Sequence, residues 1–256
     1  MFPRFNVLGV GVHAACMRQT LTFLMNAASE RQSGYVCIAG IETVVKAHDD
    51  PALREILNQS LLTIANDCRV ATVGRLAGHA CLTPVESPDL MQQLCRRSAA
   101  HGLRHFLLSD GTVAPEAVKT RLQTTCPELQ VVGTASVSGV PSAEEERSVL
   151  QQLRACRPDF IWINLPSIEQ EQFMARCMSQ LEHGVMIGVG SAFAGLAELK
   201  ASLGRTASFR SLLRRHLLIP FRFTLLVLAQ LAGLRHYDLP SRTQPLQSGY
   251  SLPRAA

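Results

Sequence analysis

The segment from Ile187 to Phe193 carries the clearest chemical pattern in the chain, because two glycines stand close together at the end of an apolar run. Gly188 and Gly190 would let the backbone approach a phosphate group closely, and a helix that starts after such a turn favours anions. A tight turn between a strand and a helix needs glycine for steric reasons alone and explains the same pattern. The sequence therefore leaves phosphate binding and a purely steric role open.

Asn66 and Asp67 form the second candidate, directly after the apolar run 62–65. Asp67 is the only acidic residue of this loop, so its carboxylate could act as a general base or hold a ribose hydroxyl. Asn and Asp are also common turn residues, because their side chains bond to the nearby backbone. A turn-forming pair without a chemical role therefore stays open as well.

Gln170 and Glu171 form the third candidate, at the start of a predicted helix that follows the apolar run 160–164. A glutamate in the first turn of a helix is commonly no more than a favourable partner for the helix dipole. The residues alone therefore favour a structural role for this pair.

Other kinds of catalytic and metal site find no support in the sequence. The eight histidines form no local constellation, and the chain has no GxSxG elbow, no Walker P-loop and no HExxH motif. The eight cysteines form no CxxC pair and no close cluster with histidine. This spacing argues against a zinc site and favours buried thiols in a reducing compartment.

Six short apolar runs alternate with amphipathic stretches, and these are the elements that must position the candidates. The runs are too continuous for strands with one solvated face, which predicts buried parallel strands joined by helices. The predicted strands are Tyr35–Ala39, Leu62–Ala65, His105–Leu108, Val131–Thr134, Phe160–Asn164 and Val185–Val189. The predicted helices are Asp50–Gln59, Pro88–Ala100 with Ser87 as N-cap, Ala114–Thr125, Ser142–Ala155 with a capping box to Glu145, and Ile168–Leu181. We therefore predict an α/β fold, Rossmann-like and doubly wound, with a mostly parallel sheet that binds ligands beyond the carboxyl ends of its strands.

Composition and charge divide the chain into three parts. Of its 256 residues, 47% are apolar and 18% are charged, which suits a globular domain better than a polytopic membrane protein or a disordered chain. The net charge of +5 is concentrated at the C-terminal end, where nine Lys or Arg and two acids follow residue 195. We predict an α/β domain over residues 1–203, a basic, apolar and helical appendage over residues 204–240, and a flexible tail over residues 241–256.

The basic appendage has three interpretations. Arg210, Arg214 and Arg215 lie among apolar and aromatic residues, which favours attraction to anionic lipid headgroups. The apolar run Leu217–Leu234 is interrupted by Arg222 and is marginal for a spanning helix. A helix packed on the domain with a solvated basic face is the plainer alternative. Nucleic acid is not expected as a partner, because the chain has no reader motif and the run is too apolar.

Taken in order, these segments resemble the WecG/TagA/CpsF family, glycosyltransferase family 26. The segment Asp49–Asn58 is similar to the family's helix DPELREALN, and the resemblance runs from about Val7 to Phe193. Further segments in the family's order are Val7–Val12, which looks like its opening strand, Gly74–Leu76, Pro88–Met91, Arg104–Leu108, Pro127–Thr134, Arg157–Asp159, Gln170–Glu171 and Ile187–Gly190. The ordered set across most of the chain makes the resemblance specific.

The resemblance implies an inverting transferase that moves a sugar from a UDP-sugar donor to a polyprenyl-diphosphate-linked acceptor in exopolysaccharide or cell-envelope polysaccharide synthesis. It implies no metal or other cofactor, and a cytoplasmic protein that is peripheral on the inner face of the membrane. A homo-oligomer or a partner transferase is a further expectation. The residues that we expect around the nucleotide are Gly40, Glu42, Asp89, Gln170, Glu171, Gly188, Gly190 and Phe193. Arg210, Arg214 and Arg215 are expected to face the diphosphate or the membrane.

Several residues depart from the family pattern at positions that carry its chemistry. Asn66 stands where the family has its proposed catalytic aspartate, and an amide cannot usefully accept a proton. Gly40 stands in place of an asparagine, Ala194 in place of an acid, and Pro166–Glu171 lacks the lysine of the family's GxPKQE motif. Three hypotheses follow. Asp67 is the replacement base of a working transferase, or the chain is a catalytically inactive paralogue that binds a nucleotide sugar, a lipid-linked glycan or a partner transferase. The third and more distant hypothesis is a Rossmann-like nucleotide-binding protein of unrelated activity.

Overall fold

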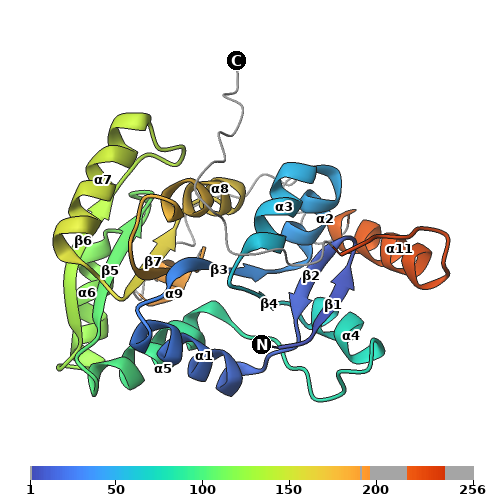
Figure 1. Cartoon of the computed structure of the whole chain (residues 1–256), viewed down its shortest axis with the longest axis horizontal. Coiled ribbons are helices and arrows are strands. Elements are labelled where there is room, and N and C mark those ends of the chain that lie inside the picture. Colours follow the sequence, from blue (N-terminus) through green and yellow to red (C-terminus); the bar gives the residue numbers. More distant parts are fainter. Residues whose placement is uncertain (1, 191, 197–217, 240–256) are drawn as a thin grey trace.

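A parallel sheet of six strands forms the centre of the computed structural model, which describes residues 2–190, 192–196 and 218–239 (Figure 1). The strands lie in the order β4-β3-β8-β7-β5-β6, and every neighbouring pair is parallel. They are β3 (Ser33–Ala39), β4 (Leu62–Ala65), β5 (Arg104–Ser109), β6 (Gln130–Ser136), β7 (Phe160–Asn164) and β8 (Gly184–Gly188). Each coincides with a predicted strand to within two residues at either end, which confirms the predicted α/β fold.

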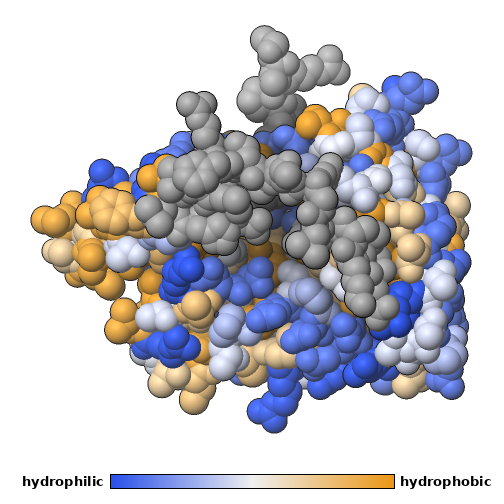
Figure 2. All heavy atoms as spheres, turned by 180° about the vertical axis from the view of Figure 1, so that it is seen from behind, coloured by the Kyte–Doolittle hydropathy of each residue, from blue (hydrophilic) through white to orange (hydrophobic). Residues whose placement is uncertain are grey.

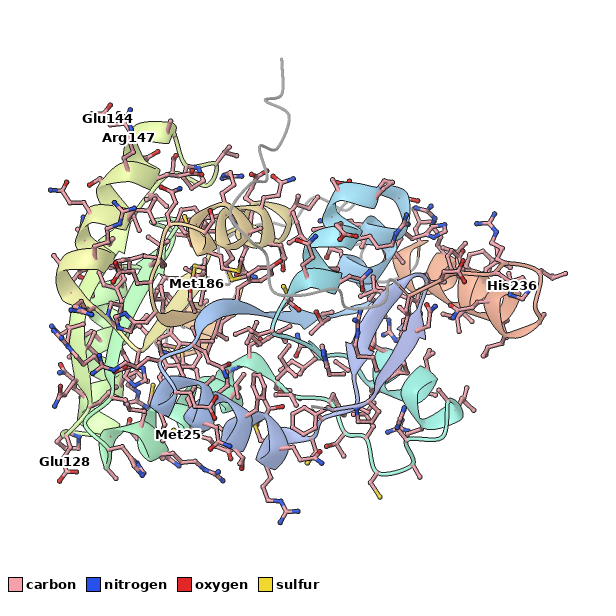
Figure 3. The ribbon with its side chains drawn as sticks, in the orientation of Figure 1. Met25, Glu128, Glu144, Arg147, Met186 and His236 are labelled. Carbon is pink, nitrogen blue, oxygen red and sulfur yellow. The ribbon has the colours of Figure 1, made fainter. Side chains whose placement is uncertain are left out.

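Helices cover both faces of the sheet and enclose two apolar cores (Figure 1). The helices on one face are α2 (Ile41–Asp49), α3 (Pro51–Gln59), α7 (Ala143–Cys156) and α8 (Ser167–Met178), and those on the other are α1 (Met17–Ser29), α5 (Ser87–Ala99), α6 (Pro115–Thr125) and α9 (Ala192–Leu196). Side chains alternate along β8, so Met186 lies in the first core and its neighbour Ile187 in the second. Figure 3 shows Met186 inside the molecule, whereas Glu144 and Arg147 of α7 lie at its edge. This is the doubly wound arrangement that the sequence predicts.

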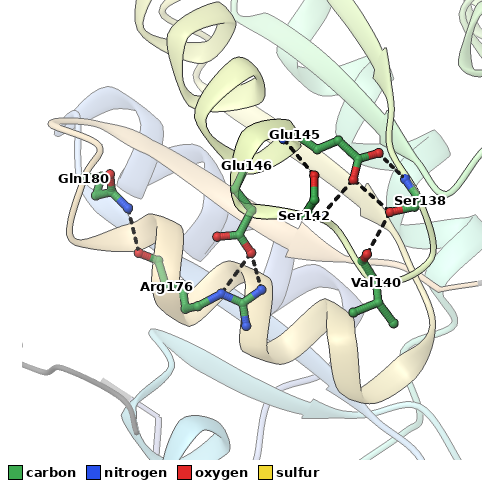
Figure 4. Close-up of polar contacts among 7 residues, drawn as sticks. All are labelled: Ser138, Val140, Ser142, Glu145, Glu146, Arg176 and Gln180. Carbon is green, nitrogen blue, oxygen red and sulfur yellow. Dashed lines mark hydrogen bonds and ion pairs between the residues drawn. The ribbon is translucent and has the colours of Figure 1, made fainter. Parts of the chain in front are cut away.

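Polar contacts fix the start of α7 and join it to α8 (Figure 4). The Ser142 hydroxyl accepts a hydrogen bond from the Glu145 N–H at 3.2 Å. The Glu145 carboxylate accepts in return from the Ser142 N–H at 2.7 Å and from the Ser138 N–H and hydroxyl, both at 2.8 Å. These bonds, with that from the Ser142 N–H foremost, lower the pKa of Glu145 to about 2 and confirm the predicted capping box. Arg176 of α8 forms an ion pair with Glu146 of α7, which fastens the two helices together.

Two predicted details are wrong. The expected opening strand over residues 7–12 is an antiparallel hairpin, because Leu8 and Gly9 have φ angles of 53° and 88° and form its turn. Its strands are β1 (Arg4–Val7) and β2 (Val10–His13). Ser87 is the first residue of α5 and not its N-cap, which is Glu86.

The helix α11 (Ile219–Leu231) lies in the described part of the predicted appendage, residues 218–239, and it packs against the hairpin and α2. Gln230 joins it to the hairpin, since its Oε1 accepts from the Leu8 N–H at 2.9 Å and its Nε2 donates to the Asn6 carbonyl at 3.0 Å. Phe223 and Val227 are buried in the first core. The rest of the predicted appendage and the predicted tail, residues 204–217 and 240–256, lie outside the described residues.

The opposite face of α11 is apolar and exposed. Its exposed large apolar side chains are Leu218, Phe221, Leu225, Leu228 and Leu231, each more than half accessible, and Arg222 and Thr224 of the same helix are exposed beside them. Figure 2 shows the resulting apolar surface at the protruding end of the molecule, where α11 lies. Among the described residues, no helix combines the length and the hydropathy that crossing a bilayer requires.

Candidate active site

A cavity of about 700 Å³ opens at the carboxyl ends of the parallel strands. Its wall contains Gly40 after β3, Asn66 after β4, Asp110 after β5, Asn164 at the end of β7 and Gly188 at the end of β8. The strands β3 and β8 are neighbours, but the helices that follow them, α2 and α9, pack on opposite faces of the sheet. Open α/β sheets bind ligands at such a switch point, so the cavity lies where the fold predicts a site.

For four of the described helices, the N-cap residue lies in the wall of this cavity. Their N-cap residues are Gly40 for α2, Asp67 for α4 (Cys68–Leu76), Glu86 for α5 and Pro166 for α8, and all four line the wall. The first N–H groups of a helix lack partners within the helix and carry partial positive charge. Their convergence favours an anionic ligand, and phosphate groups in particular.

Asn66 and Asp67 both line the cavity. The Asp67 carboxylate caps α4, because its Oδ1 accepts a hydrogen bond from the Arg69 N–H at 2.7 Å and lies 3.9 Å from the Arg69 Nε. Its Oδ2 has no hydrogen bond to another described residue, and the side chain is 26% exposed. One oxygen of Asp67 therefore holds the helix, while the other remains an acceptor for a ligand.

Gln170 connects α8 to the glycine-containing loop after β8. Its Oε1 accepts a hydrogen bond from the Gly190 N–H at 2.9 Å. A Cβ on Gly188 would lie 2.4 Å from the Gln170 Nε2 and 2.9 Å from the Met174 Cε, so any larger residue there would displace the Gln170 side chain. Gly190 has open space around it but a φ of +52°, which favours glycine for its conformation. Packing at Gly188 and backbone conformation at Gly190 thus explain why glycine stands at both positions. Both residues also line the cavity together with Gln170.

Glu171 is a buried carboxyl group in the wall of the cavity. Its Oε1 accepts a hydrogen bond from the Gln170 Nε2 at 3.3 Å, whereas its Oε2 has no partner among the described residues. Burial raises the pKa of Glu171 to about 7, against smaller opposite effects of hydrogen bonds and of the Lys46 charge. Burial, and next the charge of Glu171, also raise the pKa of the Cys37 thiol on β3. The carboxyl can therefore be neutral near physiological pH, and a neutral carboxyl can donate a hydrogen bond.

Glu42 completes the set of predicted residues that the structure brings to the cavity. Asp89 and Phe193 are not part of the wall. Asp89 lies exposed on α5, beyond its first two residues, which do line the cavity, and Phe193 is fully buried in the second apolar core. The three predicted arginines, Arg210, Arg214 and Arg215, lie outside the described residues.

Other residues line the cavity that the sequence does not single out. The polar and charged ones are Thr43, Arg69, Glu86, Asp110, Thr112 and Asn164. The Asp110 N–H donates to the Asn164 carbonyl at 2.9 Å, and the Asp110 Oδ1 accepts from the N–H and the hydroxyl of Thr112 at 2.9 and 2.5 Å. The rule that ligands bind beyond the carboxyl ends of the strands selects the loop 109–112, but it singles out no residue within that loop. Glu86 does not directly follow a strand, so nothing in the sequence indicates that it lies in the site.

Within the described part of the chain, no three His, Cys, Asp or Glu side chains are grouped so that they could hold a metal ion. The acids of the cavity are instead spread over different helix starts and loops. That the protein needs no metal therefore stays a prediction.

Comparison with known proteins shows to which family the chain belongs. Residues 5–237 match the family described as Glycosyl transferase WecG/TagA/CpsF family. Two relatives from Staphylococcus aureus, of strains NCTC 8325 / PS 47 and COL, carry the name N-acetylglucosaminyldiphosphoundecaprenol N-acetyl-beta-D-mannosaminyltransferase. Each is 24% identical over 199 residues, which cover 75% of this chain and 76% of the relative. The family match spans most of the chain and confirms the resemblance seen in the sequence, so the chain belongs to the WecG/TagA/CpsF family of glycosyl transferases.

Proposed function

We propose that the protein is an inverting glycosyltransferase that moves a sugar from a UDP-sugar to a polyprenyl-diphosphate-linked acceptor in exopolysaccharide or cell-envelope polysaccharide assembly. Family membership supports the class of reaction. The names of the relatives support an N-acetylhexosamine as the sugar and a diphosphate-linked polyprenol as the acceptor. The observation that carries the proposal is the convergence of four helix N-termini and Asp67 on one cavity at the switch point of the sheet.

The helix N-termini would bind the diphosphate of the donor. Gly40 and Pro166, the N-caps of α2 and α8, line the cavity together with the loop from Gly188 to Gly190, so phosphate oxygens there would meet the first backbone N–H groups of α2 and α8. Such fixed donors stabilise the negative charge that develops on the leaving UDP, because they need no reorganisation during the reaction. Arg210, Arg214 and Arg215 would provide cationic groups that bind either the diphosphate or the membrane surface.

Asp67 would be the general base. Its Oδ2 would accept the proton of the acceptor hydroxyl while the hydroxyl oxygen attacks the anomeric carbon of the donor. The bond from that carbon to the diphosphate breaks on the opposite side, and UDP leaves with the electron pair, which inverts the anomeric centre. Asn66 cannot take the proton and would serve as a hydrogen-bond partner for a substrate.

The exposed face of α11 would hold the protein at the membrane that contains its acceptor. Side chains such as Leu225 and Leu228 can enter the interface between headgroups and acyl chains, and a basic segment next to them would be attracted by anionic lipids. We therefore propose a peripheral protein of the inner membrane surface that works from the cytoplasmic side. A second copy of the chain or a partner transferase is a further proposed partner.

The test is a transfer assay with undecaprenyl-diphosphate-linked N-acetylglucosamine as acceptor and UDP-N-acetylmannosamine or UDP-N-acetylglucosamine as donor. Calorimetric titration with the same donors runs in parallel. Binding followed by release of UDP on addition of the acceptor supports a working transferase. Binding without turnover favours the catalytically inactive paralogue, and absence of binding contradicts the proposal.

A further inference from the structure

We propose that Glu171 binds a phosphate group of the nucleotide sugar as a neutral carboxylic acid, so that the ligand and one proton enter the cavity together. The inference rests on the proposed function, because the anion that Glu171 receives is the diphosphate of the donor. It adds a ligand contact and a coupled proton to the site, and neither follows from the helix N-termini alone.

The position of Glu171 is that of a ligand-binding group. Its side chain is 1% exposed and yet lines the cavity, and its Oε2 has no hydrogen-bond partner among the described residues. An unpaired polar atom in a protein interior costs free energy, so such an atom calls for an external partner. Gln170 occupies the other oxygen, because its Nε2 donates to Oε1 while its own Oε1 receives the Gly190 N–H. The oxygen without a partner among the described residues is therefore Oε2.

The groups around Glu171 give it no cation of its own. The titratable groups of the neighbouring elements are Glu42, Lys46, His48 and Asp49 on α2, Tyr35 and Cys37 on β3, Arg54 and Glu55 on α3, and Glu144, Glu145, Glu146, Arg147, Arg154 and Cys156 on α7, whereas β8 carries none. Of these, Lys46 is the cation whose charge acts on Glu171, but the Lys46 ammonium lies 3.0 Å from the Glu42 carboxylate. Arg54 is engaged by the carbonyl oxygens of residues 47 and 48. Nothing in this environment compensates a charged Glu171 fully, so the neutral form is favoured.

The cavity wall is acidic, which strengthens the argument. Besides Glu171, its described residues include the carboxylates Glu42, Asp67, Glu86 and Asp110, and Arg69 is the one cationic side chain among them. A diphosphate beside an ionised Glu171 would meet a further negative charge at close range. Its binding therefore raises the pKa of Glu171 above the value of about 7 that burial sets. The protonated carboxyl then donates a charge-assisted O–H···O hydrogen bond to the phosphate.

A dependence of binding on pH follows from this coupling. Below about pH 6 the carboxyl already carries its proton, so binding takes up none. Near pH 8 it is mostly ionised before binding, and a proton must come from the solvent. We expect uptake close to one proton there, and a loss of affinity of about tenfold between pH 6.5 and pH 8.5.

The experiment is calorimetric titration of the full-length protein with UDP-N-acetylglucosamine and UDP-N-acetylmannosamine near pH 8, in two buffers with different heats of ionisation. UDP-sugars are better probes than UDP, because a terminal phosphate itself titrates at about pH 6. The wild type should take up close to one proton. Glu171→Gln should bind with none and without the loss of affinity at high pH, since its amide is neutral and still donates.

Glu86→Gln is the matched control. It makes the same chemical change at an exposed carboxylate of the same cavity, so its proton uptake should equal that of the wild type. Binding without proton uptake, or equal uptake by Glu171→Gln, overturns the inference and leaves the proposed function standing. No binding of either UDP-sugar by the wild type overturns the proposed function itself.

A second measurement covers the case in which Glu171→Gln does not fold. The infrared difference spectrum of the wild type near pH 8 should gain the carbonyl band of a neutral carboxylic acid when the UDP-sugar binds. An unchanged or weakened band contradicts the inference.

Discussion

The Oε1 of Gln170 accepts a hydrogen bond from the backbone N–H of Gly190 at 2.9 Å, which ties the first turns of α8 to the loop after β8. The Nε2 of the same side chain donates to Glu171. One amide therefore sets the position of the glycine-containing loop and of the buried carboxyl at once. Both lie in the cavity wall, so a small displacement of Gln170 should be felt by any ligand there.

Gly188→Ala should disturb this arrangement. The new Cβ would lie 2.4 Å from the Gln170 Nε2 and 2.9 Å from the Met174 Cε, so the Gln170 side chain must move and its bond to Gly190 should break. We expect a loss of about 1–3 kcal/mol in the free energy of unfolding, together with weaker binding of UDP-sugars. Denaturant unfolding and calorimetry measure the two effects.

Gly195→Ala is the control for this substitution. Nothing lies within 4 Å of a Cβ at Gly195, and the residue is exposed on α9. Stability and binding should both stay near the wild-type values. If Gly188→Ala behaves like Gly195→Ala, the close packing of Gln170 on β8 does not shape the site.

Replacements of Asp67 should separate its two roles. Asparagine caps a helix about as well as aspartate, whereas alanine at an N-cap costs about 1 kcal/mol. Asp67→Asn should therefore keep the stability of the wild type, and Asp67→Ala should lower it. Both should reduce the transfer rate by about 100-fold or more, because neither side chain can accept the proton. A transfer rate of Asp67→Asn near that of the wild type would show that another group is the base.

Glu171→Gln should change the pH dependence of stability in a definite direction. The pKa of Glu171 is raised from its ordinary value of 4.5 to about 7 in the folded protein. Its contribution to stability is therefore fully present below about pH 4.5 and is lost as the pH rises through about 7. The variant lacks this loss, so near pH 8 it should be more stable than the wild type by up to about 3 kcal/mol.

Urea unfolding of both proteins near pH 5 and pH 8 measures this effect. The other titrating groups are common to both proteins and drop out of the difference. A difference that is equal at the two pH values would mean that Glu171 has an ordinary pKa in the folded state.

The central sheet could be predicted because its signal is local. The strands Leu62–Ala65 and Phe160–Asn164 agree with prediction residue for residue, since each is a continuous apolar run between turn or helix-starting residues. The hairpin at Leu8 and Gly9 could not be predicted, because Val7 and Val10 on either side of the turn, with Leu8 within it, resemble one continuous strand. Asn58 stabilises the turn from a distance: its Nδ2 donates to the Gly9 carbonyl at 3.0 Å.

The site was predictable at the level of loops and less so at the level of side chains. The rule of strand ends places Asn66 and Gly188 correctly at the cavity, because it depends only on topology. The burial of Glu171 has no local signal, since a glutamate near the start of a helix usually faces water. It is set by the packing of α8 on β3, which only the fold reveals. Helices α1, α2 and α4 were also not predicted. Because α2 and α4 begin at the cavity, two of its four helix N-termini were therefore missing from the prediction.

The exposed face of α11 should bind anionic vesicles through its leucines. Leu225 and Leu228 are each 58% exposed, and each can contribute about 1.5–3 kcal/mol when it enters the acyl region. Leu225→Gln combined with Leu228→Gln should therefore weaken binding to vesicles of phosphatidylglycerol by more than about tenfold. The double variant should stay folded, because both residues are exposed and the buried face with Phe223 and Val227 is unchanged. Leu76→Gln makes the same change at a 68% exposed leucine on α4 and should bind vesicles as the wild type does. Co-sedimentation with vesicles measures the binding, and equal binding by the double variant would mean that this face of α11 meets a protein and not a membrane.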